Sequence, residues 1–253
     1  MLLQERRQQV LELITRKGFA TLTDLARSLG ASESTVRRDL EYWQGRGLLK
    51  RIHGGAMYTG DETLPPLEER SGQQLAEKRA IARAAVELIH DGDAILLDGG
   101  TTTLEVARLL VNRPLHVVTN SVPIAQILSG SHQTQLVMLG GYVYPKTGVA
   151  LGQLLIGMLQ DIHVQYALMS VSGITPKGLF NSNTLLVESE RAIMRQANQV
   201  IVLADHTKFG RQPLAHLGPL SDIDVLITDP GMPPDYRHHL DEASVRLIVA
   251  PLD

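Results

Sequence analysis

Apolar residues near the start of the chain repeat at intervals of three and four, the spacing of an amphipathic helix. Leu3, Val10 and Ile14 fall on one face of a helix predicted from about Gln4 to Lys17. Gly18 follows, and glycine is favoured just past the end of a helix. The chain is therefore expected to begin with a helix of about four turns.

Two shorter helical patterns follow, separated by a turn. Four apolar residues at helical spacing predict a second helix that ends at Gly30: Leu22, Leu25, Ala26 and Leu29. Ser32 then stands where the N-cap of a third helix is expected. That helix has its own apolar stripe, formed by Val36, Leu40 and Trp43. Two short helices joined by a turn are typical of a helix-turn-helix, in which the second is the recognition helix.

The opposite face of the third helix is polar. Its residues are Ser34, Arg37, Arg38 and Glu41. Arginine can bond guanine bidentately or hold phosphate, so Arg37 and Arg38 are the leading candidates for DNA contact. An arginine pair taken alone more often solvates a helix surface, but the preceding helix and turn favour DNA binding here.

An apolar and basic alternation follows over Leu48–Ala56, closed by two glycines. This pattern predicts a small β-hairpin, the wing of a winged helix-turn-helix. Lys50, Arg51 and His53 are placed to touch phosphate, which would add affinity and register with little sequence information. Ordinary solvation of a hairpin is the alternative for these three residues.

Beyond this point the chain alternates between apolar runs and helical patterns. Residues 59–76 show no sustained spacing of apolar residues and are expected to form a linker. The linker would join a DNA-binding domain over residues 1–58 to an effector-binding and oligomerisation domain over residues 77–253. The apolar runs lie at 94–97, 116–118, 136–139, 166–171, 200–204, 225–228 and 245–249. Helical patterns between them include 77–89, 103–110 and 185–197. This rhythm predicts an α/β domain with a mostly parallel sheet.

Polar and glycine residues follow several of these runs. They are Asp98, Gly99, Gly100, Thr101, Thr102, Thr103, Asn120, Gly140, Gly141, Asp205 and Lys208. Because ligands bind at the carboxyl ends of parallel strands, these residues are expected to converge on one site. Glu188, within the helical pattern 185–197, is either a carboxylate of that site or an ordinary helix charge.

Residues 99–103 join a predicted strand to a helix start, where backbone N–H groups and the helix dipole favour an anion. The segment matches neither the Walker A motif nor the dinucleotide fingerprint, so ATP and NAD are poorly supported. A simple turn is the alternative for this loop. Asp98 and Asn120 can hydrogen-bond sugar hydroxyls or stabilise turns, and Lys208 is either a phosphate ligand or an exposed loop lysine.

Composition narrows the function classes further. The absence of cysteine excludes disulfides, thiolate zinc sites and a cysteine nucleophile, and no His-Glu-x-x-His spacing occurs, so we expect no metal and no cofactor. No signal peptide and no apolar run of about 18 residues is found, so a cytoplasmic protein is expected. Residues 1–58 carry a net charge of +4 and the remainder carries −7, so only the smaller part suits a phosphate backbone.

Two segments together resemble a known signature. Ser32–Leu40 (SESTVRRDL) followed by His53–Ala56 (HGGA) is similar to the DNA-binding region of the DeoR family of bacterial regulators. The resemblance implies that Thr35, Arg37 and Arg38 lie at or near DNA. It also suggests the hypothesis that Asp39 orients these arginines.

The larger domain resembles the DeoR sensor domain, whose fold is similar to ribose-5-phosphate isomerase. The segments that carry this resemblance are 98–103, 119–120, 139–141 and 205–210. They imply effector binding, with Lys208 near the ligand anion. Residues 178–183 are expected to shape the choice of sugar.

The function expected from these observations is ligand-controlled transcription. Double-stranded operator DNA and a phosphorylated sugar or related metabolite are the expected partners, and a homodimer or homotetramer is expected. The resemblance implies a repressor of carbohydrate-metabolism genes, because family members usually repress transcription until a ligand binds and relieves the repression. Two alternatives stay open: a sugar-phosphate isomerase with Glu188 or Asp98 as base and Lys208 as anion holder, and an architectural DNA binder without effector.

Overall fold

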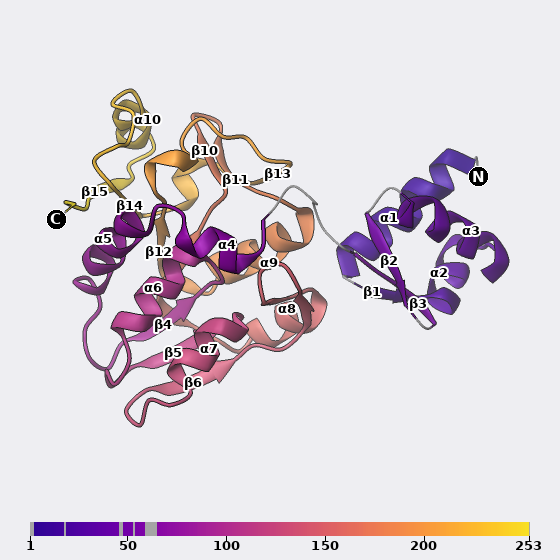
Figure 1. The fold of residues 1–253 in the computed structure, drawn as a ribbon, viewed down its shortest axis with the longest axis horizontal. Helices are drawn as coiled ribbons and strands as arrows, with labels where there is room; N and C mark the ends of the chain where they lie inside the picture. The colour runs from indigo at the N-terminus through magenta and orange to yellow at the C-terminus, as the bar shows by residue number, and fades with distance from the viewer. Residues whose placement is uncertain (1–2, 18, 46–47, 53, 59–64, 253) are drawn as a thin grey trace.

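A computed structural model describes residues 3–17, 19–45, 48–52, 54–58 and 65–252 of the chain (Figure 1). The N-terminal part contains three helices, α1 (Leu3–Lys17), α2 (Leu22–Leu29) and α3 (Glu33–Gln44). It also contains a three-stranded antiparallel sheet in the order β1 (Phe19–Thr21), β3 (Gly55–Tyr58) and β2 (Leu49–Ile52). The predicted helices and hairpin are present, and β1 is an addition because three residues are too few to show a period.

Local sequence explains the helix-turn-helix geometry. The Thr21 side chain caps α2, and Gly30 ends it in the left-handed conformation with φ of 58°. The hydroxyl of Ser32 accepts from the backbone N–H of Thr35 and so caps α3. One apolar cluster joins all the elements; its fully buried members include Val10, Ile14, Leu25, Val36, Leu40, Leu49 and Ala56.

Asp39 lies on the inner face of α3 with only 1% of its surface exposed. Its carboxylate accepts from Arg6 Nε at 2.7 Å and from Arg7 Nε at 3.2 Å. Asp39 therefore orients arginines of α1, and the hypothesis that it orients Arg37 and Arg38 of α3 is wrong. The ion pairs connect α3 to α1 beside the apolar cluster that these helices share.

The larger domain is built on a seven-stranded parallel sheet, as the apolar runs predict. The strand order is β15 (Arg246–Val249), β14 (Val225–Thr228), β12 (Ala197–Leu203), β9 (Val164–Ser170), β4 (Ala94–Leu97), β5 (His116–Thr119) and β6 (Gln135–Met138). Neighbouring strands pair in parallel register throughout, for example Leu96 with Val118. The sheet is therefore an open α/β sheet rather than a closed barrel.

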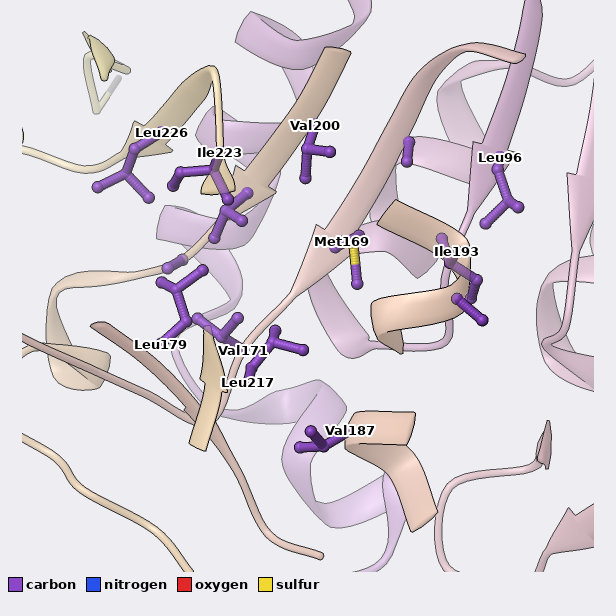
Figure 2. Packing of buried hydrophobic residues seen from close by; sticks show 14 of the residues in the cluster. Leu96, Met169, Val171, Leu179, Val187, Ile193, Val200, Leu217, Ile223 and Leu226 are labelled. Carbon is purple, nitrogen blue, oxygen red and sulfur yellow. The ribbon is translucent and has the colours of Figure 1, made fainter. Parts of the chain in front are cut away.

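Helices cover both faces of this sheet (Figure 1). Alternate strand residues such as Ile95 and Leu97 pack against α5 (Leu75–Val86), α6 (Thr101–Leu109) and α7 (Val122–Leu128). The intervening residues, including Leu96 and Met169, pack against α8 (Gln153–Leu159), α9 (Thr184–Met194) and α10 (Tyr236–Glu242), and Figure 2 shows part of this cluster. Burial on both faces explains why the strands are continuous apolar runs.

Smaller elements lie beyond the main sheet. One hairpin pairs β7 (Tyr142–Tyr144) with β8 (Val149–Leu151), and a second sheet has the order β10 (Gly173–Thr175), β11 (Gly178–Asn181) and β13 (Ala215–Gly218). The expected linker over residues 59–76 also contains structure, because residues 67–72 form α4 and α5 begins at Leu75. None of the described helices combines the length and apolar character needed to cross a membrane.

Candidate functional site

A cavity of about 530 Å³ opens at the carboxyl ends of β4, β9 and β12. The strand order reverses at this point, since β5 and β6 follow β4 on one side and β9 and β12 lie on the other. Residues at or just beyond the ends of these three strands supply much of the wall: 99–102, 170–172, Asp205, Thr207 and Lys208. Open parallel sheets bind ligands at this kind of position.

The N-terminus of α6 forms one part of the wall. Gly100 is its N-cap residue and provides no side-chain cap, and Thr101 and Thr102 of the first turn line the cavity. A Cβ atom on Gly99 would lie 1.7 Å from Val149 Cγ1, and one on Gly100 would lie 2.5 Å from Ser170 Cβ. Both positions therefore require glycine, and the first turn of α6 borders the cavity without a side-chain cap, an arrangement that suits an anion.

Four basic side chains line the same cavity: Arg70, Lys78, Lys208 and Arg211. The pKa of Lys78 is lowered to about 8, chiefly by burial; Asp205 opposes the shift, and Lys208 and Arg70 contribute to it. Burial also lowers the pKa of Lys208, while Asp205, whose Oδ2 lies 3.6 Å from Lys208 Nζ, opposes that shift. Four cations held close together in a partly buried cavity favour a ligand with at least one strong negative charge.

A second part of the wall is acidic. Glu190 of α9 has 3% of its surface exposed and accepts a hydrogen bond from Asn181 Nδ2. Asp98, at the end of β4, lies behind the lining and accepts from Asn120 Nδ2 at 3.2 Å. Burial, together with the charge of Asp98, raises the pKa of Glu190 well above its usual value, and burial raises that of Asp98 to about 6.

Several buried polar atoms of the lining have no hydrogen-bond partner within the described chain. They are Arg70 Nη2, Thr147 Oγ1, Ser170 Oγ, Ser182 Oγ and Glu190 Oε2; Asp205 Oδ2 has only its 3.6 Å ion-pair contact with Lys208 Nζ. Buried polar groups are nearly always paired in folded proteins, because an unpaired group costs about 1 to 3 kcal/mol. Their concentration around one cavity indicates a polar ligand with many hydrogen-bonding atoms.

The recognition helix presents its polar face to solvent. Ser34, Arg37 and Arg38 are exposed, and Thr35 is half-buried beside the N-cap Ser32. Lys50 and Arg51 are exposed on β2, and Arg51 forms an ion pair with Glu41 of α3. His53, the remaining wing residue of the sequence prediction, lies outside the described residues.

Comparison with protein families decides the identity of both domains. Residues 6–61 match the DeoR-like helix-turn-helix domain, and residues 73–230 match the DeoR C terminal sensor domain. The chain belongs to the DeoR family. The predicted N-terminal helix-turn-helix and the parallel-sheet α/β domain are confirmed.

Curated members of the DeoR family match along nearly their whole length. The putative aga operon transcriptional repressor of Escherichia coli O157:H7 is 32% identical over 250 residues, which cover 97% of this chain and 93% of that protein. The glycerol-3-phosphate regulon repressor of Escherichia coli strain K12 is 29% identical over 245 residues, with coverage of 96% and 97%. The named relatives are transcriptional regulators.

Solved structures match more distantly. Ribose 5-phosphate isomerase A from Methanocaldococcus jannaschii has 20% sequence identity and a TM-score of 0.36, with coverage of 52% of this chain and 53% of that chain.

The DeoR sensor domain brings together half of the site residues predicted from sequence. Six of them line the cavity: Gly99, Gly100, Thr101, Thr102, Asp205 and Lys208. Three others, Asp98, Thr103 and Asn120, are buried behind the lining, where Thr103 Oγ1 donates to the Gly100 carbonyl at 3.0 Å. Their hydrogen bonds hold the lining residues Gly99 and Gly100 in place.

The remaining three predicted residues lie outside the lining of the DeoR sensor cavity. Gly140 and Gly141 precede the β7–β8 hairpin, where a Cβ on Gly141 would lie 2.6 Å from the Leu151 carbonyl oxygen. Glu188 is half-buried on α9, and Glu190, two residues further on, lines the cavity. Two helical positions differ by about 200° around the axis, so Glu188 and Glu190 point in different directions.

Segments singled out from the sequence supply four more lining residues. Asn181 and Ser182 belong to residues 178–183, and Ser172 and Thr207 follow strands and carry the same strand-end signal as Lys208. The other polar and charged lining residues were not predicted from sequence: Arg70, Gln73, Gln74, Lys78, Thr147, Ser170, Glu190 and Arg211. Arg70 and Lys78 come from α4 and α5, and no strand-end rule identifies residues that a helix brings to a sheet edge.

Proposed function

We propose that the chain is a repressor of carbohydrate-metabolism genes whose affinity for operator DNA falls when a phosphorylated sugar or related metabolite occupies the cavity. The observation that carries this proposal is the convergence of four basic side chains and the uncapped N-terminus of α6 on one cavity. A phosphoryl group matches both features. The repressor role is supported by relatives named as repressors, including that of the glycerol-3-phosphate regulon.

The segment α4 is the proposed route from ligand to DNA. It follows the connection to the DNA-binding domain directly, and Arg70 Nε donates to the Pro65 carbonyl at 3.0 Å. Lys78 Nζ donates to the Arg70 carbonyl at 2.6 Å, so two of the basic lining residues also hold α4 in place. A ligand that draws Arg70 and Lys78 toward itself changes these contacts and favours one arrangement of the domains.

The sensor domain is also the proposed site of assembly into a homodimer or homotetramer, which would place two recognition helices on related half-sites. Operator binding makes the cytoplasm the proposed compartment. The ligand is proposed to be bound and released without turnover, so an assay for sugar-phosphate isomerisation is expected to show no activity above background.

Exchanging the exposed arginines of α3 tests the DNA interface. Arg37→Ala and Arg38→Ala are each expected to weaken operator binding by about 1 to 3 kcal/mol where a base contact is lost, measured by fluorescence anisotropy. Arg195→Ala, which removes the same charge from an exposed position of the sensor domain, serves as the control. Operator affinities equal to that of the control would contradict the assignment of α3 as the reading helix.

A thermal-stability screen tests the ligand class. Phosphorylated sugars and polyols are each paired with their unphosphorylated forms, because a ligand that binds only the folded state raises its apparent stability. We expect stabilisation by some phosphorylated members and by none of their unphosphorylated partners. Equal stabilisation by both members of a pair would contradict the proposal that the ligand needs a phosphoryl group to bind.

A further inference from the structure

Glu190 is the one carboxyl of the lining that comes from α9. One oxygen, Oε1, accepts from Asn181 Nδ2, and the other, Oε2, is buried without a hydrogen-bond partner in the described chain. The residue is 3% exposed and lines the cavity. A carboxyl oxygen in this position needs a partner, and the cavity is where a ligand can supply it.

The state of Glu190 follows from its neighbour. Burial and the neighbouring carboxyl of Asp98 both make ionisation of Glu190 more costly. Asp98 accepts from the Gly99 backbone N–H and from Asn120, whereas Glu190 accepts from Asn181. Burial first and the charge of Asp98 second raise the pKa of Glu190, and Asp98 has the larger set of donors, so we assign the shared proton to Glu190.

The basic side chains form a separate group. Lys208 acts electrostatically on Lys78, and both lysines have Asp205 and Arg70 as charged neighbours, whereas the charged neighbour that acts on Glu190 is Asp98. The basic residues come from α4, α5 and the turn after β12, and Glu190 and its partner Asn181 come from α9 and the end of β11. We therefore distinguish a basic wall that suits an anion from a carboxyl wall that suits an uncharged, hydrogen-bonding group.

We propose that Glu190 recognises an uncharged hydroxyl or carbonyl oxygen of the effector, and that it restricts effectors to compounds with a single phosphoryl group. This assignment rests on the proposed function, because it concerns the second wall of the same cavity. A neutral carboxyl can donate a hydrogen bond to such an oxygen. A second phosphoryl group placed beside Asp98 and Glu190 would lose its hydration, and no basic side chain of this wall would compensate for its charge.

Matched ligands and variants test the assignment by calorimetric titration of the full chain at pH 7. The probes are inorganic phosphate, ribose 5-phosphate, fructose 6-phosphate and the bisphosphates ribose 1,5-bisphosphate and fructose 1,6-bisphosphate. We expect at least one monophosphate to bind, and its bisphosphate to bind at least tenfold more weakly. A bisphosphate that binds as tightly as its monophosphate would overturn the proposal.

Two variants of Glu190 separate hydrogen bonding from charge. Glu190→Gln keeps the size and a neutral donor, so monophosphate affinity should stay within about threefold of that of the natural chain. Glu190→Leu removes the hydrogen bond and should weaken the sugar monophosphate about tenfold, while inorganic phosphate, which needs only the basic wall, binds as before. Glu188→Leu on the same helix is the control and should leave both affinities unchanged.

The outcomes distinguish the two levels of the proposal. Binding of neither inorganic phosphate nor any monophosphate to the natural chain would overturn the proposed function and the role of Glu190 together. Binding of both kinds of probe with no loss in Glu190→Leu would overturn the role of Glu190 alone. Equal losses in Glu190→Gln and Glu190→Leu would show that the carboxylate charge is needed, which also contradicts the proposal.

Discussion

Replacing Lys208 with alanine is expected to weaken binding of a phosphorylated ligand by about 10- to 150-fold, because a hydrogen bond to a charged group contributes about 1.5 to 3 kcal/mol. Lys208 lines the cavity and is held near Asp205, with 3.6 Å between Lys208 Nζ and Asp205 Oδ2. Without the ligand, operator affinity should equal that of the natural chain, since α3 and the wing are untouched. Calorimetry gives the first quantity and fluorescence anisotropy the second.

Lys177→Ala is the matched control for this experiment. Lys177 is exposed in the turn between β10 and β11, so its removal changes the net charge equally without altering the cavity. Ligand affinity in this variant should be unchanged. If Lys208→Ala also binds the ligand normally, the phosphoryl group does not lie beside Lys208, and if operator affinity falls equally, the variant has lost its fold.

A single methyl group at Gly100 is expected to abolish detectable ligand binding and to lower the free energy of unfolding by about 1 to 3 kcal/mol. The Cβ of Gly100→Ala would lie 2.3 Å from Ser170 Oγ and 2.5 Å from Ser170 Cβ. Relief requires either β9 or the first turn of α6 to move, and both supply the cavity wall. Denaturant unfolding measures the stability change, and calorimetry measures the loss of binding.

Gly157→Ala provides the opposite control. Gly157 lies within α8, and no atom approaches within 4 Å of the position that its Cβ would occupy. Alanine favours the helical conformation over glycine, so this variant should be more stable by about 0.5 to 1 kcal/mol and should bind ligand normally. A Gly100→Ala variant with normal stability and normal binding would show that α6 does not need close contact with β9.

The sequence predicted the main sheet well because of where its strands lie. The central strands are buried on both faces, so runs such as Ile95–Leu97 are apolar throughout and are easily separated from the helices between them. The strands β10 and β11 contain three and four residues, which is too short for a period. The helix α4 has no apolar stripe and depends on contacts with distant residues, such as the backbone N–H of Leu67 donating to the Lys146 carbonyl at 3.0 Å.

The candidate site was predictable where it is made from strand ends. Gly99, Gly100 and Lys208 follow strands of a parallel sheet, and topology alone brings them together. Helix residues such as Lys78 and Glu190 reach the cavity through the angle at which α5 and α9 pack on the sheet. That angle depends on side-chain packing across the whole interface, which periodicity does not specify.

Operator titration with and without ligand tests the central claim most directly. An operator duplex selected from random sequences is titrated with the full chain by fluorescence anisotropy at fixed salt concentration, alone and with a saturating monophosphate from the stability screen. We expect the ligand to weaken operator binding by about 5- to 150-fold in the natural chain and to have no effect at the same concentration in Lys208→Ala. Operator affinity that stays the same with every monophosphate that binds would contradict control of DNA binding by the cavity.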